Sequence, residues 1–370
     1  MIILNSFINQ NKNKMKRKLL LVMVLCLTII TTGFAQPGAK KEKKALDLNE
    51  EIKLDGKVRT GKLPSGLTYY VKSNKKPENR AEFQIAVNAG SVLETEAERG
   101  LAHFTEHMGF NGTKHYPGNE MIDALEKQGI IFGYQINAGT GFDQTVYNVE
   151  LPTDKPELFN MGLKILDGWA SGMLMSSSEI DKERGVIIEE WRLYQGAEDR
   201  FRAKTWPTML KGSPYAERLP IGTLENLQNF KHETIRGFYK KWYRPDNMAI
   251  IVVGDFDADE MEQKIIDYFG MGDAPTTPLN RPVITLPDNK EPLIAIATDK
   301  EANNNSIEFF YKHPAQKVKT IGDYRNRYLL TALYSDMLNS RLRDLSEKKN
   351  CPFIGAGASY SSYIARPTDV

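Results

Sequence analysis

Two histidines four positions apart, His103 and His107 in the segment HFTEH, are the feature that most constrains the fold of this chain. Residues three and four positions apart lie on one face of an α-helix, so a helix brings both imidazoles and the carboxylate of Glu106 to the same side. Two such imidazoles can bind one zinc ion, and the carboxylate can act as a general base. The spacing therefore predicts a zinc-binding helix, with a chance pattern on a helix surface as the alternative.

A catalytic zinc site needs three protein ligands and one open position. The segment ERGVIIEEWR, residues 183–192, is expected to be helical and contains three glutamates. Glu183 and Glu190 are seven positions apart, which is about two turns, so they share a helix face. An acidic helix is more often a solvated surface. The residues alone therefore leave the third ligand open.

The N-terminus has the features of an export signal. Five basic residues between Lys12 and Lys18 precede an apolar run at residues 19–30, and the small residues around Ala35 suit cleavage before Gln36. The apolar run is too short to span a bilayer comfortably, although a membrane anchor is the alternative. Either Met1 or Met15 can be the start. We expect residues 1–35 to be removed, the protein to be exported to the periplasm, and no stable membrane span to remain.

Charge and cysteine content exclude two further classes of protein. The chain has 49 basic and 47 acidic residues, and without the five basic residues of the signal 44 basic residues remain. A mildly acidic chain lacks the clustered basic face that nucleic-acid binding needs. Cys26 lies in the signal, which leaves Cys351 alone, so no intrachain disulfide is expected.

Alternation of short apolar segments and longer amphipathic segments predicts an α+β fold. Strands are expected at residues 66–71, 81–87, 136–151 (two strands and a turn), 248–253, 293–298 and 307–311, and helices at 94–109, 119–128, 157–170, 179–194, 232–242, 258–269 and 324–347. The pattern indicates two similar units, each a mostly antiparallel sheet with helices packed on it. We assign residues 36–53 to a flexible leader, 54–228 to a zinc-bearing domain and 229–370 to a second domain.

HFTEH, the following MGFNGT and ERGVIIEEWR together resemble the pitrilysin, or inverzincin, family of zinc metallopeptidases (M16), from about residue 58 onward. The resemblance implies that His103, His107 and Glu190 bind one zinc ion per chain and that Glu106 is the general base. It also implies that Glu183 is not itself a zinc ligand but orients the site by contacting one of the ligands.

The gap from His107 to Glu190 is longer by several residues than is usual in this family. Spacing alone would select Glu183 as the ligand. The local sequence Glu-Arg-Gly-Val-Ile-x-x-Glu matches without gaps when Glu190 is chosen, and residues 130–142 can absorb an insertion in a loop. Glu190 is therefore the expected third ligand.

The resemblance further implies a zinc-dependent endopeptidase that hydrolyses peptides or small unstructured proteins. Asn137 and Ala138 match the edge strand onto which family members add the substrate as an extra β-strand. The chain resembles the N-terminal half of a longer bacterial exported protease, whose C-terminal half or partner subunit closes the substrate chamber. Residues 229–370 correspond to a non-catalytic homologous domain that looks truncated. A catalytically silent peptide-binding or partner subunit that retains zinc is the alternative, although the intact Glu106 argues against it.

Overall fold

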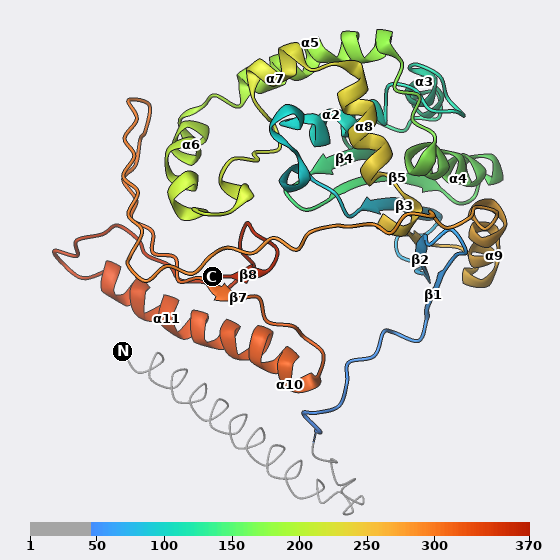
Figure 1. Ribbon diagram of the computed structural model, residues 1–370. Helices are drawn as coiled ribbons and strands as arrows, with labels where there is room; N and C mark the ends of the chain where they lie inside the picture. Colours follow the sequence, from blue (N-terminus) through green and yellow to red (C-terminus); the bar gives the residue numbers. More distant parts are fainter. Residues whose placement is uncertain (1–45) are drawn as a thin grey trace, which may run out of the picture. The chain divides into compact units, whose positions relative to one another are not determined.

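A computed structural model of the chain describes residues 46–370 (Figure 1). The predicted signal at residues 1–35 and most of the predicted leader lie outside the described residues. Within residues 46–370, every helix is too short or too polar to cross a membrane.

Six strands form one sheet in the order β1-β2-β6-β3-β5-β4. Their bounds are β1 (Val58–Lys62), β2 (Thr68–Ser73), β3 (Arg80–Val87), β4 (Ile136–Thr140), β5 (Thr145–Pro152) and β6 (Met248–Gly254). All neighbouring strands are antiparallel except β2 and β6, which are parallel. The sheet is mostly antiparallel, as predicted, and β4 forms one of its edges.

One face of this sheet carries the hydrophobic core. Buried side chains occupy every second position of β3, β5 and β6, which is the period of a strand with one covered face. Helix α4 (Pro156–Ser171) covers this face: Phe83 meets Phe159 with ring centroids 5.6 Å apart, and Tyr147 stacks on Trp169 at 5.3 Å. Helix α9 (Ala258–Phe269) packs farther along the sheet, on β2 and β1.

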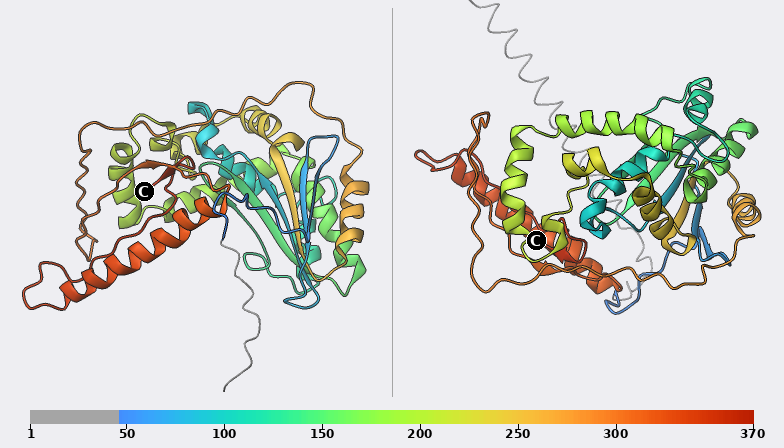
Figure 2. Two further views of the ribbon diagram at one scale, coloured as in Figure 1. Left: turned by 90° about the horizontal axis from the view of Figure 1, so that it is seen from below. Right: turned by 45° about the horizontal axis from the view of Figure 1, so that its top comes forward.

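Helix α2 (Leu101–Met108), which contains HFTEH, lies on the same face as α4. The hydroxyl of Tyr147 donates to the carbonyl of Thr105 in α2 at 3.3 Å. Helix α5 (Ser177–Leu193) lies next to α2, as Figures 1 and 2 show. The remaining helices of this part are α3 (Glu120–Glu126), α6 (Ala197–Met209), α7 (Leu224–Asn229) and α8 (His232–Trp242).

Two helix starts differ from the prediction. The helix expected at residues 94–109 begins only at Leu101, because Gly100 has φ +94°, a left-handed conformation that interrupts a right-handed helix. Two short 3-10 turns, Ser91–Leu93 and Glu96–Glu98, precede it. The helix expected from residue 179 begins at Ser177, as α5, because the Ser176 hydroxyl caps it by accepting from the N–H of Glu179.

The predicted domain boundary at residues 228 and 229 does not coincide with the end of the first sheet. Strand β6, from beyond that boundary, lies between β2 and β3, and α8 and α9 pack on the same layer. Residues up to Phe269 therefore belong structurally to the six-stranded sheet and the helices that cover it. A local sequence pattern reveals a strand but not its partner, and a parallel partner is distant in sequence.

In residues 271–370, the helix predicted at 324–347 is confirmed. Helix α10 (Ile321–Tyr324), the π-helical segment η5 (Arg325–Leu330) and α11 (Thr331–Ser346) follow without a break (Figure 2). The strands predicted at residues 293–298 and 307–311 are wrong, because neither segment pairs with a neighbour in the described chain. Their large apolar side chains stay largely exposed. Among the described residues of this part, β7 (His313–Pro314) and β8 (Thr368–Asp369) are the two named strands, and they pair with each other.

Candidate metal centre

Helix α2 presents two imidazoles on one face. The Nε2 atoms of His103 and His107 are 3.2 Å apart, and the rings are nearly perpendicular at 82°. The opposite side of the helix is anchored in the core by three fully buried side chains, Leu101, Phe104 and Met108. Burial of that apolar side fixes the rotation of the helix, and this turns both histidines away from the sheet.

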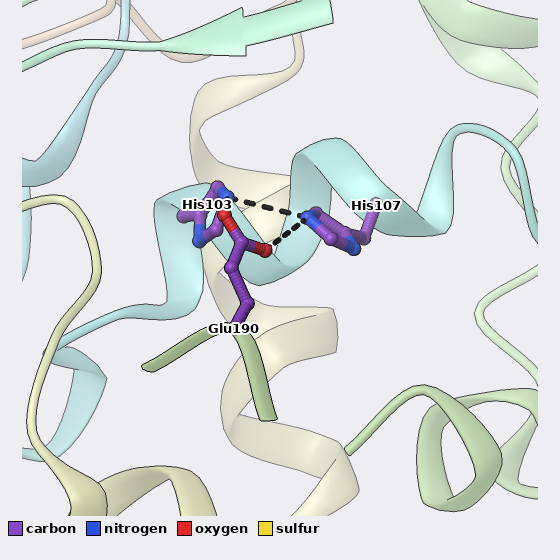
Figure 3. Close-up of side chains that lie close together, drawn as sticks. All are labelled: His103, His107 and Glu190. Atoms are coloured by element: carbon purple, nitrogen blue, oxygen red, sulfur yellow. Dashed lines mark hydrogen bonds and ion pairs between the residues drawn. The ribbon is translucent and has the colours of Figure 1, made fainter. Parts of the chain in front are cut away.

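Helix α5 brings Glu190 to both imidazoles (Figure 3). Its carboxylate oxygens lie 3.3 Å from Nε2 of His107 and 3.6 Å from Nε2 of His103. Among residues 46–370, this is the set of three potential ligands whose donor atoms all lie within 4.8 Å of one another. Two imidazole nitrogens and one carboxylate are a donor set that zinc commonly takes in catalytic sites.

Glu183 lies on the other side of the His107 ring. Its Oε1 atom is 2.8 Å from Nδ1 of His107, and its Oε2 atom accepts from the side-chain amide of Asn111 at 2.7 Å. A hydrogen bond from Nδ1 to a carboxylate orients a ligating histidine and leaves Nε2 for the metal. Asn111 has no role in the prediction from sequence. It lies just after the end of α2, and its side-chain amide also donates to the carbonyl of His107 at 3.1 Å.

The charges of the cluster fit a cation at its centre. Burial would lower the pKa of His107, but the carboxylates of Glu183 and Glu190 raise it to about 9. Burial and the neighbouring His107 lower the pKa of His103 to about 4, and the bond to His107 lowers the pKa of Glu190. These shifts favour a proton on His107, between the carboxylates of Glu183 and Glu190. Nδ1 of His103 is buried and has no hydrogen-bond partner among residues 46–370. A divalent ion can replace the proton on His107, so the residues fit zinc.

Glu106 lies next to the imidazoles and is only 7% exposed. Its Oε2 atom accepts from the hydroxyl of Thr140 at 2.8 Å, at the end of the edge strand β4. Burial raises the pKa of Glu106, and the hydrogen bond from Thr140 opposes this shift. A carboxylate with a raised pKa is a better proton acceptor than an ordinary one. Thr140 was not predicted, because it meets Glu106 only through the folding of β4 against α2.

These side chains line a cleft of about 1160 Å³. Residues 137–140 of β4 form one wall, and α5 and α6 form much of the other, with the aromatic side chains of Trp191 and Trp206. Helix α6 was not predicted, because its apolar residues do not repeat at the helical period and it has no fully buried side chain.

Comparison with known proteins decides the family. The family model described as Insulinase (Peptidase family M16) matches residues 69–215, and the model described as Peptidase M16 inactive domain matches residues 229–364. The crystal structure of the first half of the periplasmic protease PqqL from Escherichia coli is similar with a TM-score of 0.76 and 31% identity, over 86% of this chain and 68% of that chain. The chain belongs to peptidase family M16.

Curated M16 relatives are considerably longer than this chain. A protein named zinc protease PQQL-like from Arabidopsis thaliana is 37% identical over 83% of this chain and 32% of its own length. A probable zinc protease PqqL from Escherichia coli is 34% identical over 84% of this chain and 33% of its own length. The chain therefore spans about a third of these relatives. The fold class is the predicted one, the M16 fold of two similar units with helices packed on a mostly antiparallel sheet.

The structure brings most of the predicted site residues together. Glu190 faces the Nε2 atoms of the two histidines and Glu183 faces Nδ1 of His107, which is the arrangement that the predicted assignment of ligand and orienting carboxylate requires. Asn137 and Ala138 lie on β4 along the cleft. The catalytic and ligand roles of these residues stay predictions.

Proposed function

We propose that this chain carries the catalytic unit of a zinc-dependent endopeptidase. The convergence of His103, His107 and Glu190, with Glu106 on the same helix, is the observation that supports the proposal most strongly. Zinc bound there would lower the pKa of a water molecule and polarise a peptide carbonyl. Glu106 accepts a proton from the attacking water and returns it to the leaving amine. Glu183 holds His107 in the orientation that ligation needs.

We propose that the substrates are peptides or small unstructured proteins. Strand β4 is a sheet edge along the cleft, so an extended peptide can pair with it through main-chain hydrogen bonds, with Asn137 and Ala138 in contact. Main-chain pairing tolerates many sequences, whereas a folded protein offers no free extended segment. The aromatic side chains of the cleft favour peptides with apolar residues.

We also propose that this protein is exported and that it works together with a second, C-terminal half. The part of the chain that matches these relatives covers only about a third of their length, and the similar crystal structure is that of the first half of a periplasmic protease. We therefore propose that a C-terminal half, or a partner subunit, closes the cleft over the substrate. The predicted signal at the N-terminus supports a periplasmic location.

Metal removal tests this function. Cleavage of a quenched, unstructured peptide is measured with the chain alone and with the remainder of the full-length protein present. A chelator should abolish cleavage, and added zinc should restore it. His103→Ala should lack activity under every condition, whereas His232→Ala should behave as the wild type, because His232 is a partly exposed histidine that pairs with Asp181 outside the cluster.

Two results would contradict the proposal. Cleavage that is insensitive to the chelator would exclude the zinc mechanism. Zinc-dependent peptide binding without cleavage, even with the remainder of the protein present, would favour the alternative of a catalytically silent partner subunit.

A further inference from the structure

The hydrogen-bonding pattern of β4 shows which of its main-chain groups face the open edge. The N–H of Gly141 donates to the carbonyl of Gln144, and the N–H of Glu150 donates to the carbonyl of Gln135. Hydrogen-bonded pairs alternate along an antiparallel ladder, so residues 135, 137, 139 and 141 direct their main-chain groups toward β5. Residues 136, 138 and 140 direct theirs toward the open edge.

This edge is already covered in part by the chain itself. The carbonyl of Ile136 accepts from the N–H of Gly133 at 2.9 Å. The N–H of Ala138 donates to Oδ1 of Asn137, the residue just before it, at 2.9 Å. An unpaired N–H group on a sheet edge attracts other extended chains, so a side chain that occupies it protects the edge. The Ala138 N–H is also the central donor that an incoming peptide would need.

We infer that Asn137 is a displaceable cap on the substrate edge: its side-chain amide occupies the Ala138 N–H in the free protein and gives way when a peptide pairs with β4. This inference rests on the proposed function, because it assumes that the substrate adds to β4. Displacement exchanges one hydrogen bond for another, since a peptide carbonyl takes the place of Oδ1. The amide of Asn137 is solvent-exposed and can turn to water.

A cap and a direct contact predict opposite effects of the same substitution. If Asn137 contacts the bound peptide, as the family resemblance implies, Asn137→Ala weakens binding. If Asn137 is a cap, Asn137→Ala removes a competitor and tightens binding by about two- to tenfold, the worth of one net hydrogen bond. Asn137→Asp should weaken binding, because a charged acceptor holds the N–H more strongly. Asn148→Ala is the matched control, since Asn148 lies directly opposite on β5 and does not bond the Ala138 N–H.

Two measurements on the intact chain test the inference. The first is the Kd of a fluorescent extended peptide, determined with a chelator present so that the peptide is not cleaved. The second is amide hydrogen exchange at Ala138, which needs no substrate. Exchange should be faster in Asn137→Ala by about the same two- to tenfold, slower in Asn137→Asp and unchanged in Asn148→Ala.

The outcomes separate this inference from the proposed function. Unchanged exchange at Ala138 in Asn137→Ala would show that the cap does not exist. Faster exchange together with weaker peptide binding in Asn137→Ala would show that Asn137 contacts the bound peptide directly. That result would contradict the claim that the peptide displaces the Asn137 side chain. If no variant binds peptide, the proposed function fails, and exchange at Ala138 alone decides whether the edge is capped.

Discussion

At the scale of single residues, the two glutamates of α5 make different contacts with the histidines. Glu190 faces the Nε2 atoms of both histidines, whereas Glu183 reaches only Nδ1 of His107 and is held by Asn111. A carboxylate that faces the lone pairs can share a metal with them. One that accepts the Nδ1 proton can only orient the ring.

Zinc content should therefore distinguish these two residues. We predict that Glu190→Gln lowers zinc well below one ion per chain, because a ligand is lost. Glu183→Gln should keep most of the metal, since loss of an orienting partner lowers affinity only about 10- to 100-fold and a tight site still fills. Metal analysis after gel filtration measures both, with the exposed Glu189→Gln as control. An empty site in Glu183→Gln beside a full one in Glu190→Gln would reverse the assignment.

The sequence was sufficient to predict the residues that a helix alone brings together. His103, Glu106 and His107 share a face because of the helical period, and Glu183 and Glu190 do so for the same reason. Thr140 could not be predicted, because it reaches Glu106 from a strand 34 positions away. Such contacts depend on how elements pack, which no local pattern specifies.

At the scale of elements, the N-terminus of α2 is fixed by two surrounding loops. The carboxylate of Glu94 accepts from the N–H groups of Gly100 and Ala102 at 3.1 and 2.8 Å. Gly222 has φ +73° and lies so close to Gly100 that an added Cβ would be 2.4 Å from the Gly100 Cα. These contacts set the start of α2, and thus the position of His103 within its first turn.

A methyl group at Gly222 should disturb this packing. We predict that Gly222→Ala lowers the free energy of unfolding by about 1–3 kcal/mol, because it adds a backbone clash to a left-handed conformation. Gly185 lies on the exposed side of α5, and an added Cβ there would meet no described atom within 4 Å beyond its own helix turn. Gly185→Ala should instead raise the free energy of unfolding by up to about 1 kcal/mol. Urea denaturation measures both. An unchanged free energy of unfolding in Gly222→Ala would contradict this, because it would show that the loops at Gly100 and Gly222 can move apart without destabilising the protein.

Elements were predictable where one face is buried and the period is regular. Strand β3 and helices α8 and α9 lie within one residue of their expected bounds, since each alternates buried and exposed side chains at its own period. Residues 293–298 and 307–311 have the composition of strands but no strand partner among the described residues, and composition alone does not pair a strand.

At the scale of the whole molecule, the part after α9 is hydrogen-bonded to the turn between β4 and β5. Arg281 donates to the carbonyls of Asn88 and Asp143 at 2.7 and 3.1 Å. Arg366 donates to the side chains of Asn88 and Gln144, both at 2.8 Å. The turn between β4 and β5 is thus bonded from two distant segments. The second domain therefore supports the geometry of β4, although it supplies no metal ligand among the described residues.

The measurement that tests the central claim most directly is hydrolysis by Glu106→Gln at full zinc occupancy, with the remainder of the full-length protein present. An amide cannot accept the proton of the attacking water, yet it matches the carboxylate in size and can still bond the Thr140 hydroxyl. We predict zinc content equal to that of the wild type and a rate of peptide cleavage lower by about 100- to 10,000-fold. A rate close to that of the wild type would show that Glu106 is not the general base and would contradict the proposed mechanism.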